Sequence, residues 1–181
     1  MGTLIGHRDR VAVEFEVHDV EPELRKWIYG TMTLWAAGQP INRHSELASM
    51  TVALTTFPGV LNSAGDRSDP RLMALPANRV YDIVHGAIYD DDEPVELTYH
   101  EATQLRLHFE RFQVSPSGFD VFDGWYICLV EDRLVGRLIW RAPDDTIHET
   151  RIGAGEFDRV IDQFLTELEK ISGQTRVKID R

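Results

Sequence analysis

Alternation of apolar and polar residues predicts β-strands in the first part of this chain. Residues 10–17 place apolar side chains on one face and Glu14 and Glu16 on the other, which is the pattern of a half-buried strand. Residues 27–37 are rich in Trp, Tyr, Ile, Thr and Leu and predict a second strand, which ends at the turn-forming residues 38–40. We expect these two strands to pair as a long hairpin.

The second half of the chain predicts a further set of strands. Residues 105–110 alternate Leu, Leu and Phe with Arg, His and Glu, which indicates a third strand. Residues 125–130 and 134–141 are apolar, and the short polar segment between them is typical of a tight hairpin. Residues 146–152 follow a Pro-Asp-Asp turn and complete a three-strand meander.

Helical periodicity marks three other segments. Residues 76–89 and 157–171 carry apolar side chains at a spacing of about 3.6 residues, as amphipathic helices do. Residues 45–61 show the same spacing, diluted by Thr and Val, and predict a helix that ends near Pro58. The polar residues 62–70 indicate a loop.

The order of these elements predicts an α+β fold. We expect one domain over residues 1–181, with a mainly antiparallel sheet packed by two or three helices, including a C-terminal helix. A chain of 181 residues is long enough to bury a sizeable core as a single domain. Residues 173–181, which follow the last helix, are expected to form a flexible tail.

The charge of the chain narrows the classes of partner. With 19 Lys and Arg against 30 Asp and Glu, the formal net charge is −11, which disfavours nucleic acid and anionic membranes as partners. The single cysteine, Cys128, cannot form an internal disulfide. The N-terminus lacks the apolar stretch of a signal peptide, and the chain contains no apolar run of about 18 residues. We therefore expect a cytoplasmic protein.

The sequence assigns no catalytic, metal-binding or cofactor-binding residue. The known motifs for nucleophilic hydrolysis, phosphate cradles, zinc proteases and calcium loops do not occur. An enzyme of unrecognised type would draw on His108 and Glu110, which a strand would place on one face about 7 Å apart. Its other candidate is Cys128, although apolar flanks favour a buried structural thiol over a reactive one.

One region concentrates the negative charge. Residues 80–105 contain seven acidic residues and no Lys or Arg, and four of the acids are consecutive. A solvated loop explains such a run, and so does a weak calcium site, although the ligand spacing of an EF-hand is missing. A contact surface for a basic partner is the third explanation. That explanation selects the following partner-binding residues: Asp90, Asp91, Asp92, Glu93 and Glu96.

Several short motifs, taken in order over residues 8–172, resemble the immunity protein 42 family of bacterial polymorphic toxin systems. They read Val11-Ala12-Val13-Glu14-Phe15-Glu16, Trp27-Ile28-Tyr29-Gly30, Leu34-Trp35-Ala36-Ala37-Gly38-Gln39-Pro40-Ile41, Phe122-Asp123-Gly124-Trp125, Leu138-Ile139-Trp140-Arg141 and Gly155-Glu156-Phe157-Asp158. The resemblance implies a small non-enzymatic protein that binds a cognate toxin domain and blocks it. An acidic inhibitor suits a basic toxin such as a nuclease, because its carboxylates imitate phosphate and steer the encounter.

Two alternatives to an immunity protein stay open at this stage. The first is the small enzyme with His108, Glu110 or Cys128 at its site. The second is a homo-oligomeric adaptor module, in which a strand edge at residues 10–17 or 27–37 would pair between copies.

Overall fold

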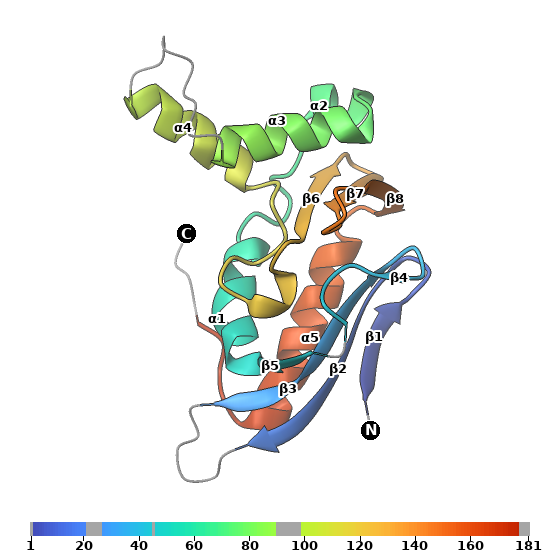
Figure 1. The fold of residues 1–181 in the computed structure, drawn as a ribbon, viewed down its shortest axis with the longest axis vertical. Helices are drawn as coiled ribbons and strands as arrows, with labels where there is room; N and C mark the ends of the chain where they lie inside the picture. Colours follow the sequence, from blue (N-terminus) through green and yellow to red (C-terminus); the bar gives the residue numbers. More distant parts are fainter. Residues whose placement is uncertain (1, 21–26, 45, 90–98, 178–181) are drawn as a thin grey trace.

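The computed structural model describes residues 2–20, 27–44, 46–89 and 99–177 (Figure 1). Two antiparallel sheets and five α-helices make up this part of the chain, which confirms the predicted α+β class. The sequence predicted one main sheet and at most three helices. The helices are α1 (Met50–Leu61), α2 (Pro70–Ala74), α3 (Ala77–Tyr89), α4 (Tyr99–Glu110) and α5 (Glu156–Ser172). No helix within these ranges is long and apolar enough to cross a membrane.

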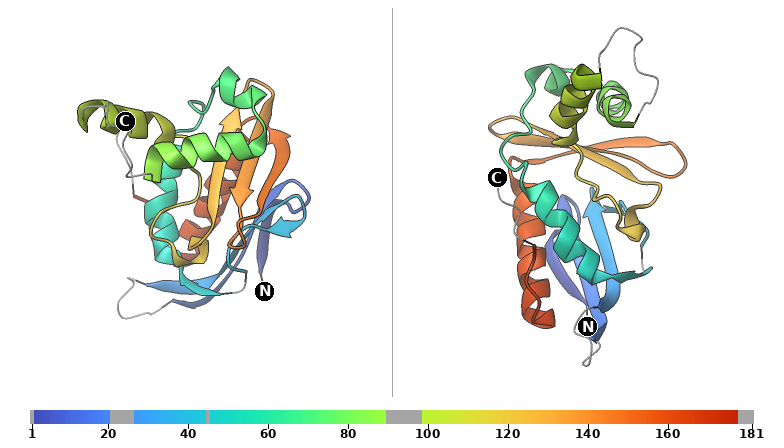
Figure 2. Two further views of the ribbon diagram at one scale, coloured as in Figure 1. Left: turned by 45° about the horizontal axis from the view of Figure 1, so that its top comes forward. Right: turned by 90° about the vertical axis from the view of Figure 1, so that its left-hand side faces the viewer.

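The N-terminal half forms a five-stranded sheet that α1 and α5 cover on one face (Figure 2). The predicted hairpin is confirmed, because β2 and β3 pair antiparallel. Since β2 lies between β1 and β3, and β3 also pairs with β4 and β5, neither strand is a free edge. Pairing between copies along these strands, which the homo-oligomeric alternative invoked, therefore has no free edge to use among the described residues. The strands are β1 (Thr3–His7), β2 (Val11–Val20), β3 (Ile28–Ala36), β4 (Gln39–Pro40) and β5 (Leu47–Ser49).

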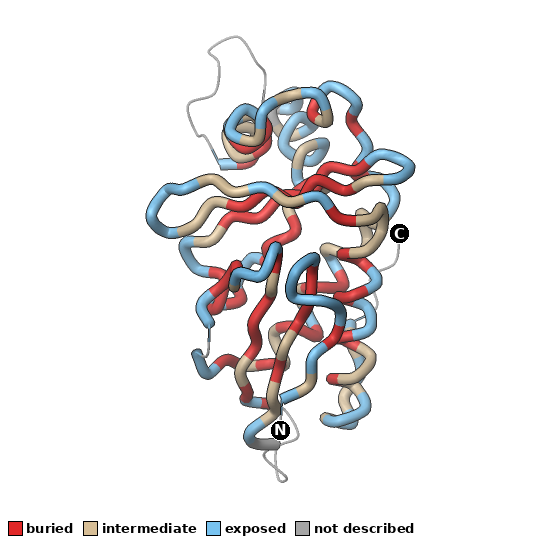
Figure 3. The backbone as a smooth tube through the Cα atoms, turned by 90° about the vertical axis from the view of Figure 1, so that its right-hand side faces the viewer, coloured by how far each residue is buried: buried red, intermediate tan, exposed pale blue. Residues whose placement is uncertain are grey.

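The C-terminal half forms a three-stranded sheet of β6 (Tyr126–Glu131), β7 (Val135–Arg141) and β8 (Ile147–Gly153), as the predicted meander requires. All six residues of β6 are buried, because both faces of this sheet are covered (Figure 3). Ile127 and Leu129 enter the main core shared with α1, α5 and the five-stranded sheet. Cys128 and Val130 enter a second core beneath α2 and α3. The three-stranded sheet is thus the middle layer of the molecule.

The strand predicted over residues 105–110 is instead the last half of α4. Six alternating residues fit either state, and the longer segment from Tyr99 contains no Gly or Pro to interrupt a helix. Arg106 and Glu110 form an i,i+4 ion pair that a helix allows. Because α4 packs on α3 rather than beside a strand, its backbone hydrogen bonds are made within the helix.

The short helix α2, which the sequence did not predict, is held on the three-stranded sheet by Arg137. Its first turn is capped by Asp69, whose carboxylate accepts hydrogen bonds from the backbone N–H groups of Arg71 and Leu72. Its last carbonyl groups accept hydrogen bonds from Nη1 of Arg137, which is 4% exposed. The other edge of that guanidinium binds both carboxylate oxygens of Glu149, at 2.8 and 2.9 Å.

A second buried arginine, Arg67, joins three distant segments. Its side chain is fully buried, and Nη1 donates to both carboxylate oxygens of Asp158 in α5, at 2.7 and 2.9 Å. Nη2 donates to the carbonyl of Val60 in α1, and Nε donates to the carbonyl of Arg111 just after α4. A planar guanidinium has fixed donor directions, so these contacts set the relative positions of α1, α5 and the end of α4.

We predict that Arg67→Met lowers the free energy of unfolding by about 3–5 kcal/mol, because it leaves Asp158 and two carbonyl groups without their donor. Urea unfolding followed by tryptophan fluorescence measures the change. The matched control is Arg71→Met, which removes an ion pair to Asp69 from a side chain that is 82% exposed. If both variants unfold at the same urea concentration, Arg67 does not hold these elements together.

The end of β6 is joined to the start of α5 by Glu131, which is 6% exposed. Its carboxylate accepts a hydrogen bond of 2.7 Å from the backbone N–H of Gly155, which has a positive φ of 65° just before the helix. Burial raises the pKa of Glu131 above its ordinary value, and this outweighs the opposing effect of the Gly155 hydrogen bond. The folded protein therefore disfavours the charged form of this carboxyl.

This raised pKa predicts a pH-dependent effect of Glu131→Gln. The contribution of Glu131 to stability is fully present below the unfolded pKa of about 4.5 and is lost as the pH rises through the folded pKa. The amide oxygen of glutamine still accepts the Gly155 hydrogen bond but never ionises. We expect the urea midpoint of Glu131→Gln to rise relative to wild type between pH 4 and pH 7. A difference independent of pH would contradict the prediction.

Candidate functional site

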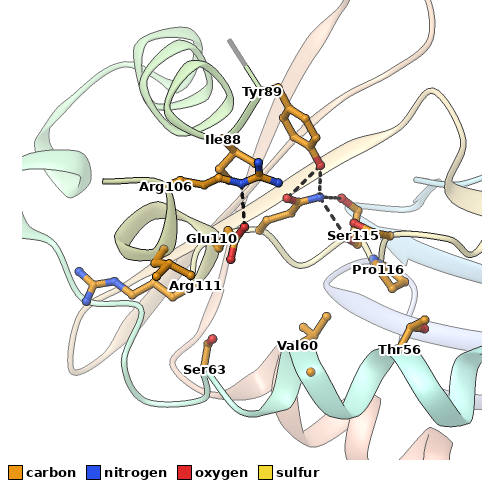
Figure 4. A pocket seen from close by; sticks show the side chains of 14 residues that line it. Thr56, Val60, Ser63, Ile88, Tyr89, Arg106, Glu110, Arg111, Ser115 and Pro116 are labelled. Carbon is orange, nitrogen blue, oxygen red and sulfur yellow. Dashed lines mark hydrogen bonds and ion pairs between the residues drawn. The ribbon is translucent and has the colours of Figure 1, made fainter. Parts of the chain in front are cut away.

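A cleft of about 520 Å³ lies between α1 and the paired helices α3 and α4 (Figure 4). One wall comes from the C-terminal half of α1, and the opposite wall from the end of α3 and the last turns of α4. The segment of residues 113–117 closes it. Its lining consists of Thr56, Gly59, Val60, Ser63, Ile88, Tyr89, Arg106, Leu107, Glu110, Arg111, Gln113, Ser115, Pro116 and Ser117.

Hydrogen bonds join Tyr89, Gln113 and Ser115 at one end of the cleft (Figure 4). The amide of Gln113 donates to the Tyr89 hydroxyl at 2.7 Å, and that hydroxyl lies 3.1 Å from the Gln113 amide oxygen. The same amide donates to the Ser115 carbonyl, while the Ser115 hydroxyl accepts from the backbone N–H of Ile127. These contacts anchor the last residue of α3 to the start of the three-stranded sheet.

The α4 wall of the cleft combines an exposed apolar side chain with charged ones. Leu107 is 55% exposed, although it belongs to a folded helix. Arg106 and Glu110 pair at 3.0 Å, and both side chains are largely in solvent. Arg111 lies over the ring of Phe112 at 4.7 Å, and its buried Nε has no acceptor among the described residues. The cleft thus offers an apolar contact and charged side chains of both signs.

The lining is mixed in chemical character. Among its described residues there is no histidine or cysteine, and its one carboxylate is the ion-paired Glu110. The described parts of the chain hold no group of three or more His, Cys, Asp and Glu side chains that could bind a metal ion. A mixture of exposed apolar, hydroxyl, amide and guanidinium groups is typical of protein–protein contact surfaces.

The acidic residues selected from the sequence, Asp90, Asp91, Asp92, Glu93 and Glu96, lie outside the described residues. Their place in the chain is nevertheless informative. In the sequence they lie between Tyr89, which ends α3 and lines the cleft, and α4. The end of α3 and the last turns of α4 belong to the same wall of the cleft. Their assignment to a partner-binding surface stays a prediction.

The residues proposed for an enzyme do not come together. Because residues 105–110 are helical, His108 and Glu110 point to different sides of α4 instead of sharing a strand face. Glu110 pairs with Arg106, while Nε2 of His108 lies 3.3 Å from Nη2 of Arg111. Cys128 is fully buried in the middle of β6, where burial raises the pKa of its thiol to about 12. The expected buried structural thiol is confirmed.

A second cavity, of about 310 Å³, also borders Tyr89 and is lined mainly by aromatic rings. Rings from α3, at Tyr81, His85 and Tyr89, all lie within 6 Å of the ring of Tyr126. The sequence carries a signal for this cluster, because the three α3 residues follow one another at i,i+4 spacing. No local signal marks the main cleft, since its lining comes from segments far apart in the chain.

Comparisons with known proteins identify a family and a similar fold. A sequence profile of the family described as Immunity protein 42 matches residues 1–167. The crystal structure of CdiI from Burkholderia dolosa AUO158 superposes with a TM-score of 0.64 at 18% sequence identity, over 91% of this chain and 99% of that chain. At this identity the structural likeness shows the fold alone. No curated protein sequence matches the chain.

The burial of Cys128 predicts a slow thiol reaction in the native protein. Reaction with a disulfide reagent at pH 8 requires that the sulfur is accessible and that the thiol is ionised to the thiolate. In the folded protein Cys128 is buried, and its raised pKa keeps the thiol protonated. We expect the reaction rate to rise with urea concentration and to become complete within minutes in the unfolded protein. Because Cys128 is the single cysteine, the signal needs no subtraction. A rapid reaction without denaturant would contradict the burial.

Proposed function

Because the chain belongs to the immunity protein 42 family, we propose that it binds a cognate toxin domain of a bacterial polymorphic toxin system and neutralises it without chemistry of its own. The family match over residues 1–167 carries this proposal. The open cleft, with exposed apolar and polar groups, is consistent with a binding surface. The protein would act in the cytoplasm, where the toxin domain would otherwise reach its target.

We further propose that the acidic run between α3 and α4 contacts the toxin. Residues 80–105 contain seven acidic residues and no Lys or Arg, so this stretch attracts basic surfaces. A toxin that cleaves nucleic acid needs a basic surface to bind phosphate, and carboxylates can occupy that surface instead. In this proposal, Asp90, Asp91, Asp92, Glu93 and Glu96 steer the encounter and block the toxin's substrate site.

Apolar contacts would then slow the dissociation of the complex. Tyr89 and Leu107 are 45% and 55% exposed, and both line the cleft beside the helices that the acidic run connects. Exposed charges mainly raise the association rate, whereas buried aromatic and aliphatic anchors slow dissociation. A stable complex of this kind buries about 1,200–2,000 Å² in total.

Co-expression tests the proposed function directly. The toxin candidate is the variable C-terminal domain of a large secreted protein encoded directly upstream. We expect cells that produce this domain to survive when this chain is produced with it, and the two proteins to purify as a stable complex. A non-cognate toxin domain serves as the specificity control. Failure to rescue, together with failure to bind, would reject this pairing.

Neutralising the acidic run tests its part in binding. We predict that changing Asp90, Asp91 and Asp92 to Asn and Glu93 to Gln lowers the association rate constant at low salt about tenfold or more, and weakens its dependence on salt. Stopped-flow or surface plasmon resonance at two salt concentrations measures both effects. An unchanged rate and salt dependence would remove the run from the interface.

A matched control for this variant changes four acids elsewhere. Asp9, Glu46, Asp120 and Asp123 are exposed and lie outside α3 and α4. Their replacement by Asn and Gln alters the net charge by the same amount. We expect the control to keep most of the wild-type association rate, because nearby charges dominate a screened interaction. An equal loss in both variants would indicate an effect of net charge alone.

A further inference from the structure

The segment that follows α5 reverses direction and runs back beside α1 (Figure 1). The reversal occurs at Gly173, which caps α5 with a positive φ of 66°. We propose that residues 174–177 are a strap that restores, from outside the helix, the hydrogen bond that Pro58 removes from α1, and that docking of this strap controls how easily α1 opens. The strap lies beyond residues 1–167, which the family profile matches, and its role does not depend on the toxin-binding function.

Pro58 leaves a gap in the hydrogen-bond ladder of α1. In an α-helix each carbonyl group accepts a hydrogen bond from the N–H group four residues later. The residue four positions after Leu54 is Pro58, which has no N–H group. Leu54 is 2% exposed, so water has little access to replace the missing donor. Because a buried carbonyl without a donor is unfavourable, the gap is an acceptor site for an N–H group from elsewhere in the chain.

The strap supplies that N–H group. The backbone N–H of Val177 donates to the carbonyl of Leu54 at 3.1 Å. The donor belongs to the main chain, and Val177 itself is 48% exposed, so its side chain can be changed with little effect on the core. The missing bond inside α1 is thus replaced by a bond between α1 and the segment after α5.

Arg176 fixes the strap on the surface of α5. Its Nη1 donates to the carboxylate of Asp162 at 2.6 Å, and its Nη2 donates to the hydroxyl of Thr166 at 2.8 Å. Nη2 and the backbone N–H of Arg176 also donate to the two carboxylate oxygens of Glu169, at 3.0 and 2.7 Å. A guanidinium has fixed donor directions, so these contacts hold residue 176 in one orientation. That orientation places the next N–H group, of Val177, against α1.

The strap acts on the helix that forms one wall of the cleft. The α1 residues that line the cleft include Gly59 and Val60, which follow the gap. A helix of 12 residues is marginally stable by itself, so α1 depends on contacts from outside: the ring of Phe57 lies 6.0 Å from that of Phe164 in α5, and Arg67 binds the Val60 carbonyl. Release of the strap removes one of these outside contacts, and it therefore loosens this wall and leaves the three-stranded sheet unchanged.

Two substitutions at residue 177 separate the backbone donor from the side chain. Val177→Pro removes the N–H group, whereas Val177→Ala keeps it. We expect Val177→Pro to raise the hydrogen–deuterium exchange rate of the amides of residues 55–62 about three- to tenfold, as the loss of one net hydrogen bond requires. Val177→Ala is expected to stay within about twofold of wild type. The amides of residues 126–131 in β6 serve as the internal reference and are expected not to change.

Pro58→Ala tests whether the strap acts through the gap. Alanine supplies an N–H group to the Leu54 carbonyl, which then keeps a donor when the strap bond is lost. In this background we expect Val177→Pro to change the exchange of residues 55–62 by less than about twofold, relative to Pro58→Ala alone. An equal effect of Val177→Pro in both backgrounds, or no effect in the wild-type background, would overturn the proposal.

Arg176→Gln gives a second test, which leaves residues 58 and 177 unchanged if their variants do not fold. Loss of the guanidinium detaches the strap from α5, and we expect faster exchange of residues 55–62 and of the Val177 amide. The matched control is Lys170→Gln, which removes an exposed ion pair to Glu167 on the same helix and is expected to exchange as wild type does. Circular dichroism checks that each variant is folded. Faster exchange of residues 55–62 in both variants, or in neither, would show that the strap does not hold α1.

Discussion

The buried guanidinium of Arg67 is the contact on which the geometry of the cleft depends. It binds the carbonyl of Val60 in α1, the carbonyl of Arg111 after α4 and the carboxylate of Asp158 in α5. Val60 and Arg111 belong to opposite walls of the cleft, so their separation is set by a residue that does not line it. Separating a buried charge from its hydrogen-bond partners is costly. The contacts of Arg67 therefore hold the two walls at a fixed separation.

The three-stranded sheet supplies the rigid support beneath this arrangement. Its two faces enter two different cores, so β6 has no exposed residue and Cys128 is protected at its centre. Arg137 and Glu149 attach α2 to the same sheet, again through a buried guanidinium with a bidentate carboxylate partner. The helices that form the proposed contact surface are therefore mounted on a layer that is close-packed on both sides.

The helix α4 and the segment before it differ from this layer in burial and in charge. The described side chains of α4 are exposed or only half-buried, and the segment that leads into the helix is the most acidic stretch of the sequence. A surface of this kind separates two roles that an inhibitor needs. Negative charge accelerates the encounter with a basic partner, and the exposed apolar side chains lower the dissociation rate once water is excluded. Because the layer beneath these helices is rigid, the protein loses less conformational entropy when its interface is ordered on binding.

The sequence by itself determined the elements whose side chains alternate or repeat over long stretches. The strand at residues 10–17 and the helices at residues 76–89 and 157–171 were predicted because one face of each is buried in a core. The strand predicted over residues 105–110 was wrong, because six alternating residues do not distinguish a strand from a helix that packs on α3. Sequence also located the acidic run and the family, both of which are local or ordered patterns. Only the tertiary structure brought Arg67 from a polar loop into the buried centre and formed the cleft from Val60, Leu107 and residues 113–117. Arg67 and its partner Arg111 lie 44 residues apart, and no sequence period relates the α1 wall of the cleft to the α4 wall.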